Sequence, residues 1–272
     1  MKPKPFLKWA GGKTQLLPVL SEHIPANFRT YYEPFVGAGA LLFHLQPKVA
    51  VVSDFNAELI NCYKVLKDKP ECLTGTIDSL PINSNFYYEL RAADRNEDFL
   101  DKPCLWRAAR FIYLNKTCFN GLYRVNKQGE FNVPFGKYKN PSIYDIENIN
   151  AVNGFLVSNS VSIEAMDFQK TLMLPHQSDF VYLDPPYDTF SDTSNFTGYT
   201  LGGFQRADQK VLKGCMDRLT ARGAKALQSN ADTPFIRELY ADYEIVEVQA
   251  KRSINSKGDK RGKVTELLIK NY

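Results

Sequence analysis

Four consecutive residues, Asp184-Pro185-Pro186-Tyr187, offer groups suited to chemistry on an amino group. They follow the apolar run 180–183, which predicts a buried strand, and open α/β sheets bind ligands at the carboxyl ends of their strands. Because proline lacks an N–H and fixes φ, the Asp184 carboxylate and the Pro185 carbonyl are preorganised acceptors for an exocyclic amino group. Such contacts turn the nitrogen lone pair towards an electrophile, and Tyr187 supplies a stacking face. The simpler alternative is a strand that ends in a proline-rich turn.

Two glycines and a second carboxylate indicate a ligand with a ribose group. Gly37-Ala38-Gly39 follows one predicted strand, and Asp54 ends the next, where a carboxylate accepts hydrogen bonds from both ribose hydroxyls of an adenosine. Leu42 takes the third glycine position of a dinucleotide fingerprint, so the ligand need not carry a pyrophosphate. S-adenosylmethionine meets these conditions, since it has a ribose, an amino-acid end that must approach the glycines closely, and a methyl group to donate.

Another glycine motif resembles an ATPase only in part. Gly12-Lys13-Thr14 has the ending of a phosphate-binding P-loop, but that motif requires a glycine where this chain has Leu7. The sequence therefore does not favour an ATPase.

The predicted elements describe an α/β fold that brings these groups to one edge of a sheet. Strands are expected over residues 30–35, 49–54, 179–183, 224–229, 243–248 and 266–269, with a helix from residue 40. The first two strands and this helix open a nucleotide-type βαβ unit. Residues 56–148 are rich in charge and aromatics, are expected to be mostly helical, and interrupt the pattern as an insertion. Within them, residues 123–126 and 130–133 predict a short β-hairpin that turns at Gly129.

Length and composition bound the class of protein. The chain has 272 residues, a length that suits one large domain or a domain with an insertion. Its net charge is +4. No apolar run approaches the length that spans a bilayer, and the first residues lack a signal-peptide core, so we expect a cytoplasmic protein without membrane contact. Five scattered cysteines indicate reduced thiols, and three histidines without ligand spacing predict no metal.

Basic residues gather in two stretches of the chain. Residues 107–141 hold seven Lys or Arg against one acid, Glu130, and residues 251–263 hold six against Asp259. One such stretch is commonly only a solvated face. Two of them, interleaved with aromatic and polar residues, favour a polyanionic partner.

Five segments share a pattern with one known family over nearly the whole chain: Phe6–Lys13 (FLKWAGGK), Glu33–Ala40 (EPFVGAGA), Phe119–Arg124 (FNGLYR), Glu130–Gly136 (EFNVPFG) and Asp184–Tyr187 (DPPY). In this order they resemble the Dam and DpnM type of DNA adenine-N6 methyltransferase, in the alpha group. The resemblance implies a Rossmann-like methyltransferase with a mixed sheet and helices on both faces. It assigns residues 1–55 and 149–272 to the catalytic domain that binds S-adenosyl-L-methionine, and residues 56–148 to an inserted target-recognition domain.

The resemblance also implies roles for residues around the predicted sheet. The catalytic motif, which would hold a flipped-out target adenine, matches Asp184, Pro185, Pro186 and Tyr187. A duplex hides the adenine amino group, so the nucleotide must be extruded before the methyl group moves by direct in-line displacement. The positions that would bind the cofactor match Trp9, Ala10, Lys13, Phe35, Gly37, Ala38, Gly39, Asp54, Asp167, Phe168 and Asp184.

In the inserted domain, the resemblance places Phe119 and Asn120 in the space left by the flipped base. Several relatives carry tyrosine at the first position, and phenylalanine keeps the stacking but not a hydroxyl contact. The resemblance further implies that the site is GATC in double-stranded DNA, read by Leu122, Arg124 and Pro134. An arginine suits the guanine O6/N7 edge, and apolar side chains suit the thymine methyl. Without the family, the same hairpin residues fit a packing contact and a solvated surface cation.

Other contacts to DNA are expected outside the hairpin. Lys8 and Tyr138 match family positions that meet the first guanine. Ser191, Thr193 and Asn195 belong to a hydroxyl-rich loop that suits phosphate oxygens, with a plain flexible loop as the alternative. Residues 252–253 and 257–263 look like a further segment for the DNA backbone, mobile without DNA.

Three other functions compete with this hypothesis. Amino-methyltransferases that act on RNA or on protein glutamine use a similar loop, although the glutamine enzymes typically carry Asn in place of Asp184. A cytosine-C5 enzyme needs a Pro-Cys nucleophile, but no glycine-rich loop precedes Pro103-Cys104. A DNA-binding protein without catalysis is disfavoured because every catalytic position is intact. We expect a monomer, and the same site would serve a restriction-modification system, a phage or the timing of replication and repair.

Overall fold

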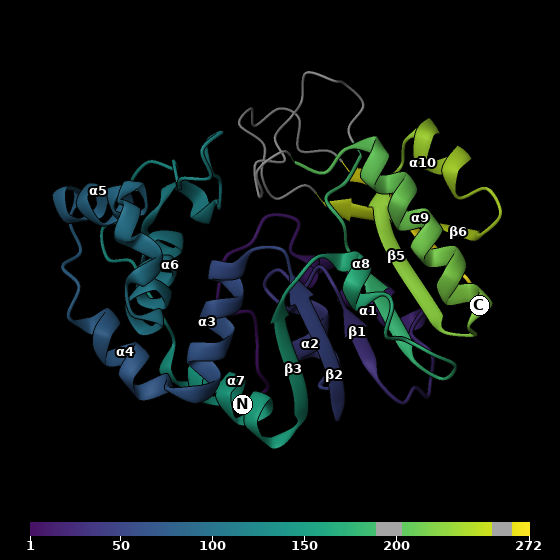
Figure 1. Ribbon diagram of the computed structural model, residues 1–272, viewed down its shortest axis with the longest axis horizontal. Coiled ribbons are helices and arrows are strands. Elements are labelled where there is room, and N and C mark those ends of the chain that lie inside the picture. The colour runs from purple at the N-terminus through teal and green to yellow at the C-terminus, as the bar shows by residue number, and fades with distance from the viewer. Residues whose placement is uncertain (189–202, 252–262) are drawn as a thin grey trace.

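Seven strands of the described residues form one mixed sheet at the centre of the molecule (Figure 1). The computed structural model describes residues 1–188, 203–251 and 263–272. The strand order is β3-β2-β1-β4-β5-β7-β6; β1 to β5 are parallel, and β7 is antiparallel to both of its neighbours. The strands are β1 (Tyr31–Glu33), β2 (Val49–Asp54), β3 (Ser160–Ala165), β4 (Phe180–Leu183), β5 (Lys225–Ala231), β6 (Glu244–Lys251) and β7 (Lys263–Lys270).

Helices cover both faces of this sheet, because its central strands send apolar side chains alternately to either side. Tyr31 and Phe180 join a core with α2, α3 and α7, whereas Tyr32 and Val181 join a second core with α8, α9 and α10. The prediction of an α/β fold with a mixed sheet and helices on both faces is therefore confirmed. The helices named here are α2 (Ala40–Leu45), α3 (Ala57–Asp68), α7 (Ile146–Ser158), α8 (Phe168–Thr171), α9 (Arg206–Ala221) and α10 (Pro234–Leu239).

The carboxyl ends of β2, β1 and β4 lie side by side. Tyr31 of β1 pairs with Phe180 of β4, and Glu33 at the end of β1 pairs with Val52 of β2. All four residues of β4 are buried, as expected for a parallel strand covered on both faces. The strand order reverses between β1 and β4, which is the point where such sheets bind ligands. The sheet therefore brings the predicted glycine loop, Asp54 and Asp184 together at the carboxyl ends of its parallel strands.

The predicted strand ranges differ from the structure by one to three residues at most of their ends, and one strand was missed. Strand β6 extends to Lys251 and β7 begins at Lys263, beyond the predicted ranges. The first strand ends at Glu33 rather than at residue 35, because Pro34 has no N–H to continue the ladder. Strand β3 was not predicted, although β2 matches its predicted range of 49–54. This strand lies at an edge of the sheet and alternates buried Val161 and Ile163 with exposed serines. Such alternation over only six residues is a weak signal.

Residues 56–148 are largely helical, and α4 (Pro70–Asp78), α5 (Ser84–Ala92) and α6 (Cys104–Thr117) gather to one side of the sheet (Figure 1). Helix α1 (Leu17–Glu22) lies elsewhere, against α2. Helix α3 packs against α6 and also against β3. None of the helices in the described ranges is long and apolar enough to cross a membrane.

The predicted hairpin is present as one antiparallel bridge rather than as two strands. Val125 pairs with Phe131, and the Asn126 N–H donates to the Glu130 carbonyl over 2.8 Å. Gly129 turns the chain with a φ of 85°, in the left-handed region that glycine adopts at little cost.

Candidate active site

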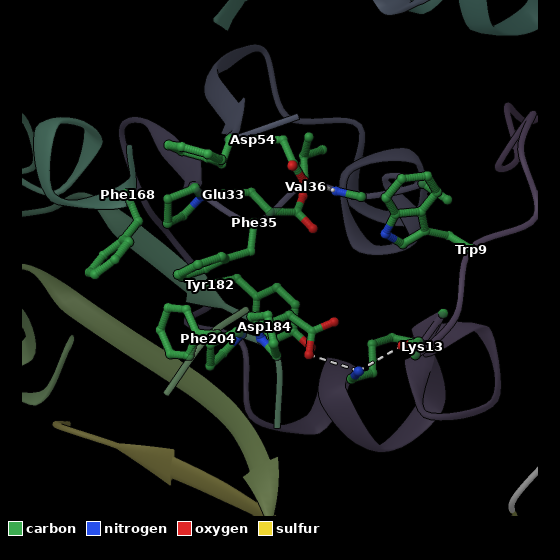
Figure 2. Close-up of a pocket in the computed structure, with 18 of the residues that line it drawn as sticks. Trp9, Lys13, Glu33, Phe35, Val36, Asp54, Phe168, Tyr182, Asp184 and Phe204 are labelled. Carbon is green, nitrogen blue, oxygen red and sulfur yellow. Dashed lines mark hydrogen bonds and ion pairs between the residues drawn. The ribbon is translucent and has the colours of Figure 1, made fainter. Parts of the chain in front are cut away.

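A cavity of about 490 Å³ opens at the carboxyl ends of β1, β2 and β4 (Figure 2). Every residue predicted to bind the cofactor or to form the catalytic motif lines this cavity. These residues come from five separate parts of the chain, which the sheet brings together. They are Trp9, Ala10, Lys13, Phe35, Gly37, Ala38, Gly39, Asp54, Asp167, Phe168, Asp184, Pro185, Pro186 and Tyr187.

The Asp184 carboxylate has a cationic neighbour inside the cavity. Lys13 Nζ lies 2.7 Å from Asp184 Oδ1 and donates to the Gly11 carbonyl over the same distance. The ammonium also lies 4.7 Å from the centroid of the Tyr187 ring, a cation–π distance. Burial raises the pKa of Asp184 above its ordinary value, and the charge of Lys13 opposes that rise. Lys13 therefore favours the ionised carboxylate.

The loop after β4 is fastened on two sides. On one side, the buried amide of Gln209 on α9 donates to the Pro186 carbonyl over 2.9 Å. On the other side, the Tyr187 hydroxyl donates to Glu266 Oε2 on β7 over 2.7 Å. Burial raises the pKa of Tyr187 well above 10, so its hydroxyl keeps the proton that this bond needs. Glu266 also lines the cavity, a position that no motif indicated in the sequence.

The glycine loop and Asp54 form one hydrogen-bonded unit. The N–H of Gly37 donates to Asp54 Oδ2 over 3.1 Å, and the N–H of Asn56 donates to Oδ1 over 3.0 Å. Gly37 has a φ of 48°, and a Cβ at this position would come within 2.8 Å of the Trp9 ring. Burial raises the pKa of Asp54 to about 6, although the backbone N–H groups favour its charged form. At neutral pH it is mostly a carboxylate with lone pairs free to accept further hydrogen bonds.

Aromatic side chains form the apolar wall of the cavity (Figure 2). Phe35 stacks on Phe168 with 5.3 Å between ring centroids, and Phe204 meets Phe35 edge-on at 5.8 Å. Phe55, beside Asp54, also lines the cavity and is 63% exposed. Sequence reasoning missed Phe55 and Phe204. The exposed aromatic directly after a strand-ending carboxylate was the available signal for Phe55.

Glu33 is a further acidic residue at the cavity wall. It is 3% exposed and accepts a hydrogen bond from the Tyr31 hydroxyl over 2.9 Å. Burial raises its pKa to about 8, so the side chain is mainly a neutral acid at pH 7. It stands in the segment that resembles the family, but no role was predicted for it.

Those of the predicted DNA-binding residues that the structure describes lie outside the cavity. Phe119 is 51% exposed, and Asn120 follows it with a φ of 56° in a short turn, η4 (Phe119–Gly121). The Phe119 N–H donates to the carbonyl of exposed Pro134 over 2.8 Å, which joins this turn to the hairpin. Arg124 is exposed on the hairpin, with Nε donating to Asn132 Oδ1 over 2.7 Å.

Two of the remaining residues predicted to contact DNA, Lys8 and Tyr138, are neighbours in the structure. Lys8 Nζ lies 5.0 Å from the Tyr138 ring centroid, so the two positions expected to meet one guanine are neighbours. Buried Asn115 bonds the N–H and the carbonyl of Lys8 and the Gly121 carbonyl, which holds Lys8 beside the turn. Leu122 is half-buried against the main core. Ser191, Thr193, Asn195 and residues 252–262 lie outside the described residues.

The expectation that the basic stretch 107–141 is a surface for a polyanion is wrong for its first two cations. Arg110 is 4% exposed and pairs with Asp94 over 2.9 Å. Arg107 forms an ion pair with Glu58 of α3. Both arginines hold helices together, because their acidic partners come from distant parts of the sequence that folding brings beside them.

Comparison with known proteins agrees with this site. The family described as D12 class N6 adenine-specific DNA methyltransferase matches residues 9–254. The chain belongs to this family. It is thus an enzyme that methylates adenine in DNA, as the resemblance implied.

Individual relatives of this D12-class enzyme align over nearly their whole length. The Type II methyltransferase M1.LlaDCHI of Lactococcus lactis is 43% identical over 99% of this chain and 95% of the relative. The Type II methyltransferase M.MjaIII of Methanocaldococcus jannaschii is 44% identical over 100% of both chains. The DNA adenine methylase of Escherichia coli K12 is 35% identical over 98% of this chain and 95% of the relative.

Two observations bear on the chemistry of this D12-class enzyme. Its cavity presents carboxylates, backbone donors and aromatic rings, which suit an adenosine-containing methyl donor. Within the described residues, no group of three or more His, Cys, Asp or Glu side chains could hold a metal ion.

Proposed function

We propose that this enzyme transfers the methyl group of S-adenosyl-L-methionine to N6 of a flipped-out adenine in double-stranded GATC. The observation that carries the proposal is the convergence of Asp54, the glycine loop and the Asp184–Tyr187 motif on one cavity. Within this one cavity, Asp54 can accept hydrogen bonds from the ribose of the methyl donor and Asp184 can accept them from the amino group of the target base. This arrangement suits the methyl donor and the target base held side by side. Positioning of the two reactants then supplies much of the rate.

The residues of the cavity fit S-adenosyl-L-methionine. Each Asp54 oxygen accepts one backbone N–H and has a further lone pair for a ribose hydroxyl. Phe55 and Phe168 supply apolar faces for the adenine ring, and Asp167 supplies an acceptor for its amino group. The loop at Gly37 to Gly39 has no side chain beyond that of Ala38, so the amino-acid end can approach the backbone. The bound cofactor supplies an electrophilic methyl group.

The Asp184 motif would hold the target amino group. Lys13 Nζ already shows that a hydrogen-bond donor can touch the Asp184 carboxylate while lying over the Tyr187 ring. An adenine stacked on Tyr187 would present its N6 hydrogens to Asp184 and the Pro185 carbonyl. These two acceptors would direct the nitrogen lone pair at the electrophilic methyl group that the cofactor supplies, with the sulfur of the cofactor as leaving group, and the methylated nitrogen would release one proton to solvent.

The inserted residues would read the DNA and extrude the base. Phe119 is an exposed aromatic at a turn, suited to fill the gap in the base stack. Arg124 and Pro134 are exposed on the hairpin, where a guanidinium suits guanine and an apolar ring suits a thymine methyl. We also propose the domain division of residues 1–55 with 149–272 and residues 56–148, since α4, α5 and α6 lie to one side of the sheet.

The test is transfer of a labelled methyl group to paired duplexes, one with GATC and one with its adenine replaced, followed by nucleoside analysis. N6-methyladenine confined to the GATC duplex is the expected result. Label on unrelated sequences would reject GATC and keep the chemistry. Label on RNA or on protein alone would reject DNA as the substrate.

A further inference from the structure

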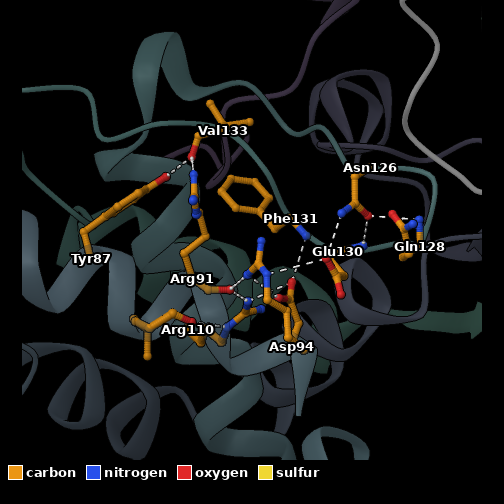
Figure 3. Close-up of polar contacts among 11 residues, drawn as sticks. Tyr87, Arg91, Asp94, Arg110, Asn126, Gln128, Glu130, Phe131 and Val133 are labelled. Atoms are coloured by element: carbon orange, nitrogen blue, oxygen red, sulfur yellow. Dashed lines mark hydrogen bonds and ion pairs between the residues drawn. The ribbon is translucent and has the colours of Figure 1, made fainter. Parts of the chain in front are cut away.

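The hairpin is fastened to the protein by side chains of two helices rather than by a neighbouring strand. We call residues 123–134 the recognition hairpin. Its second arm, with buried Phe131 and Val133, faces α5 and α6, and the polar contacts between them form one network (Figure 3). The first arm joins the second at the bridge of Val125 and Phe131 and through the bond of Arg124 to Asn132, and its Tyr123 stacks on Phe111 of α6. The polar attachments to α5, α6 and the turn between them lie on the second arm.

Asp94 is the centre of this network. Its Oδ2 accepts the Phe131 N–H over 2.8 Å and pairs with Arg110 Nη2 over 2.9 Å. Its Oδ1 lies 3.3 Å from Arg95 Nη1. The carboxylate is 10% exposed, and a charge-assisted bond to a backbone N–H in such a place is among the stronger hydrogen bonds. The Asp94 side chain thus fixes the N–H of Phe131, the residue of the second arm that forms the bridge to the first.

Arg110 is held by more than its acidic partner. Its Nε donates to the Leu90 carbonyl over 2.7 Å, and its Nη2 donates to the Arg91 carbonyl over 2.8 Å. Leu90 and Arg91 belong to the last turn of α5, where the cap N–H of Ala93 also donates to the Leu90 carbonyl, and the carbonyls at the end of a helix favour a cation. Arg110 comes from α6, so the guanidinium joins α5, α6 and the carboxylate that carries the hairpin.

The carbonyl of Val133 makes a second attachment. It accepts the Tyr87 hydroxyl over 2.8 Å and Arg91 Nη1 over 3.3 Å. Pro134, the next residue, is exposed, and Arg124 is exposed on the opposite arm. The bonds to the Phe131 N–H and the Val133 carbonyl, together with the ion pair of Glu130 to Arg95 and the stacking of Tyr123, therefore set where the two outward side chains stand.

We infer that Asp94 is a specificity-determining positioning residue that sets the place of Arg124 and Pro134 against the DNA bases. Arg110 supports it by pairing with Asp94, and Tyr87 supports it by bonding the Val133 carbonyl. Asp94 does not need to touch DNA for this role. The inference rests on the proposed reading of GATC by the hairpin. A small shift of the arm moves the Arg124 guanidinium off a base edge whose hydrogen bonds require close alignment.

The test compares Asp94→Asn with the matched control Asp98→Asn, which removes an exposed ion pair to Lys102 four residues away. The quantity measured is the ratio of kcat/KM on a GATC duplex to that on duplexes with one outer base pair changed. Asp94→Asn keeps an oxygen for Phe131 but leaves Arg110 without its counter-charge. We expect this ratio to fall about tenfold, within the range of one lost base contact, and to stay unchanged in the control.

Further outcomes separate this inference from the function it rests on. A wild-type enzyme with no preference for GATC rejects the proposed reading itself. A selective wild-type enzyme whose Asp94→Asn variant keeps the full ratio, or loses activity equally on all duplexes, overturns the role of Asp94. If Asp94→Asn does not fold, Tyr87→Phe tests the second attachment more gently, because Arg91 still bonds the Val133 carbonyl. We expect a smaller fall in the ratio with unchanged cofactor affinity, and an unchanged ratio overturns the inference.

Discussion

Lys13 Nζ lies 2.7 Å from Asp184 Oδ1, within a cavity where the two side chains are 7% and 20% exposed. The two residues are far apart in the sequence, and the contact of a lysine from the glycine-lysine segment with the Asp184 carboxylate was not predicted. The family resemblance predicted that Lys13 helps to bind the cofactor. The geometry adds a direct influence on the charge of Asp184.

Replacement of Lys13 by Met should move the acid limb of the pH–rate profile to higher pH. The pKa of Asp184 is already raised by burial, and loss of the ammonium raises it further. Because the ionised carboxylate is lost as pH falls through this pKa, the variant loses its acceptor at a higher pH. Single-turnover methyl transfer across a pH series measures the shift. The control is Lys64→Met, which removes an exposed ion pair with Glu164. Coincident acid limbs would show that Lys13 does not set the charge of Asp184.

Replacement of Asp184 by Ala should abolish methyl transfer while cofactor and DNA affinities stay within about tenfold, since the side chain acts mainly on the transition state. Single-turnover chemistry and equilibrium binding to both ligands separate these effects. Turnover at the wild-type rate would remove Asp184 from the mechanism. A large loss of cofactor affinity alone would instead make it a binding residue.

Replacement of Arg124 by Ala should relax discrimination at one guanine by about 1 to 3 kcal/mol, the contribution of a bidentate contact to a base edge. Lys127→Ala is the matched control, because Lys127 is an exposed cation at the turn of the same hairpin. If Lys127 contacts a phosphate, its loss would weaken DNA binding equally on all sequences and lower the salt dependence of that binding. The measurement is kcat/KM on GATC and on each singly substituted duplex. A uniform loss for Arg124→Ala would make it a phosphate contact as well.

Replacement of Glu33 by Gln should flatten the pH dependence of stability. The folded pKa of Glu33 is about 8, above its ordinary 4.5, so between these values the folded protein binds more protons than the unfolded chain. The free energy of unfolding therefore falls as pH rises through this window, and glutamine does not titrate. Urea unfolding at several pH values above about 6 avoids most of the titration of Asp54. Equal slopes for wild type and variant would show that Glu33 is ionised in the folded protein at neutral pH.

The cavity could be predicted from the sequence because its residues stand in short segments whose local structure depends on near neighbours. Asp54 ends an apolar strand, and Asp184 precedes two prolines, so each side chain is directed by the few residues around it. The parallel order of β2, β1 and β4 then brings these segments to one edge.

Contacts that depend on distant packing could not be predicted in this way. In the sequence, Arg110 cannot be told from an arginine that binds phosphate. It is internal because α5 offers the Leu90 and Arg91 carbonyls and the turn after α5 offers Asp94. Glu266 has no motif around it, and its bond to Tyr187 joins positions 79 residues apart. The hairpin was predicted from its turn, but its attachment to helices depends on side chains outside it.

Strand β7 comes last in the chain, yet it lies inside the sheet between β5 and β6. During synthesis, β6 leaves the ribosome first and, among the described strands, has no partner until residues 263–270 follow. The same late strand delivers Glu266, the acceptor of the Tyr187 hydroxyl. A nascent chain in which β7 has not yet paired therefore lacks both strand pairings of β7 and the Glu266 support of Tyr187.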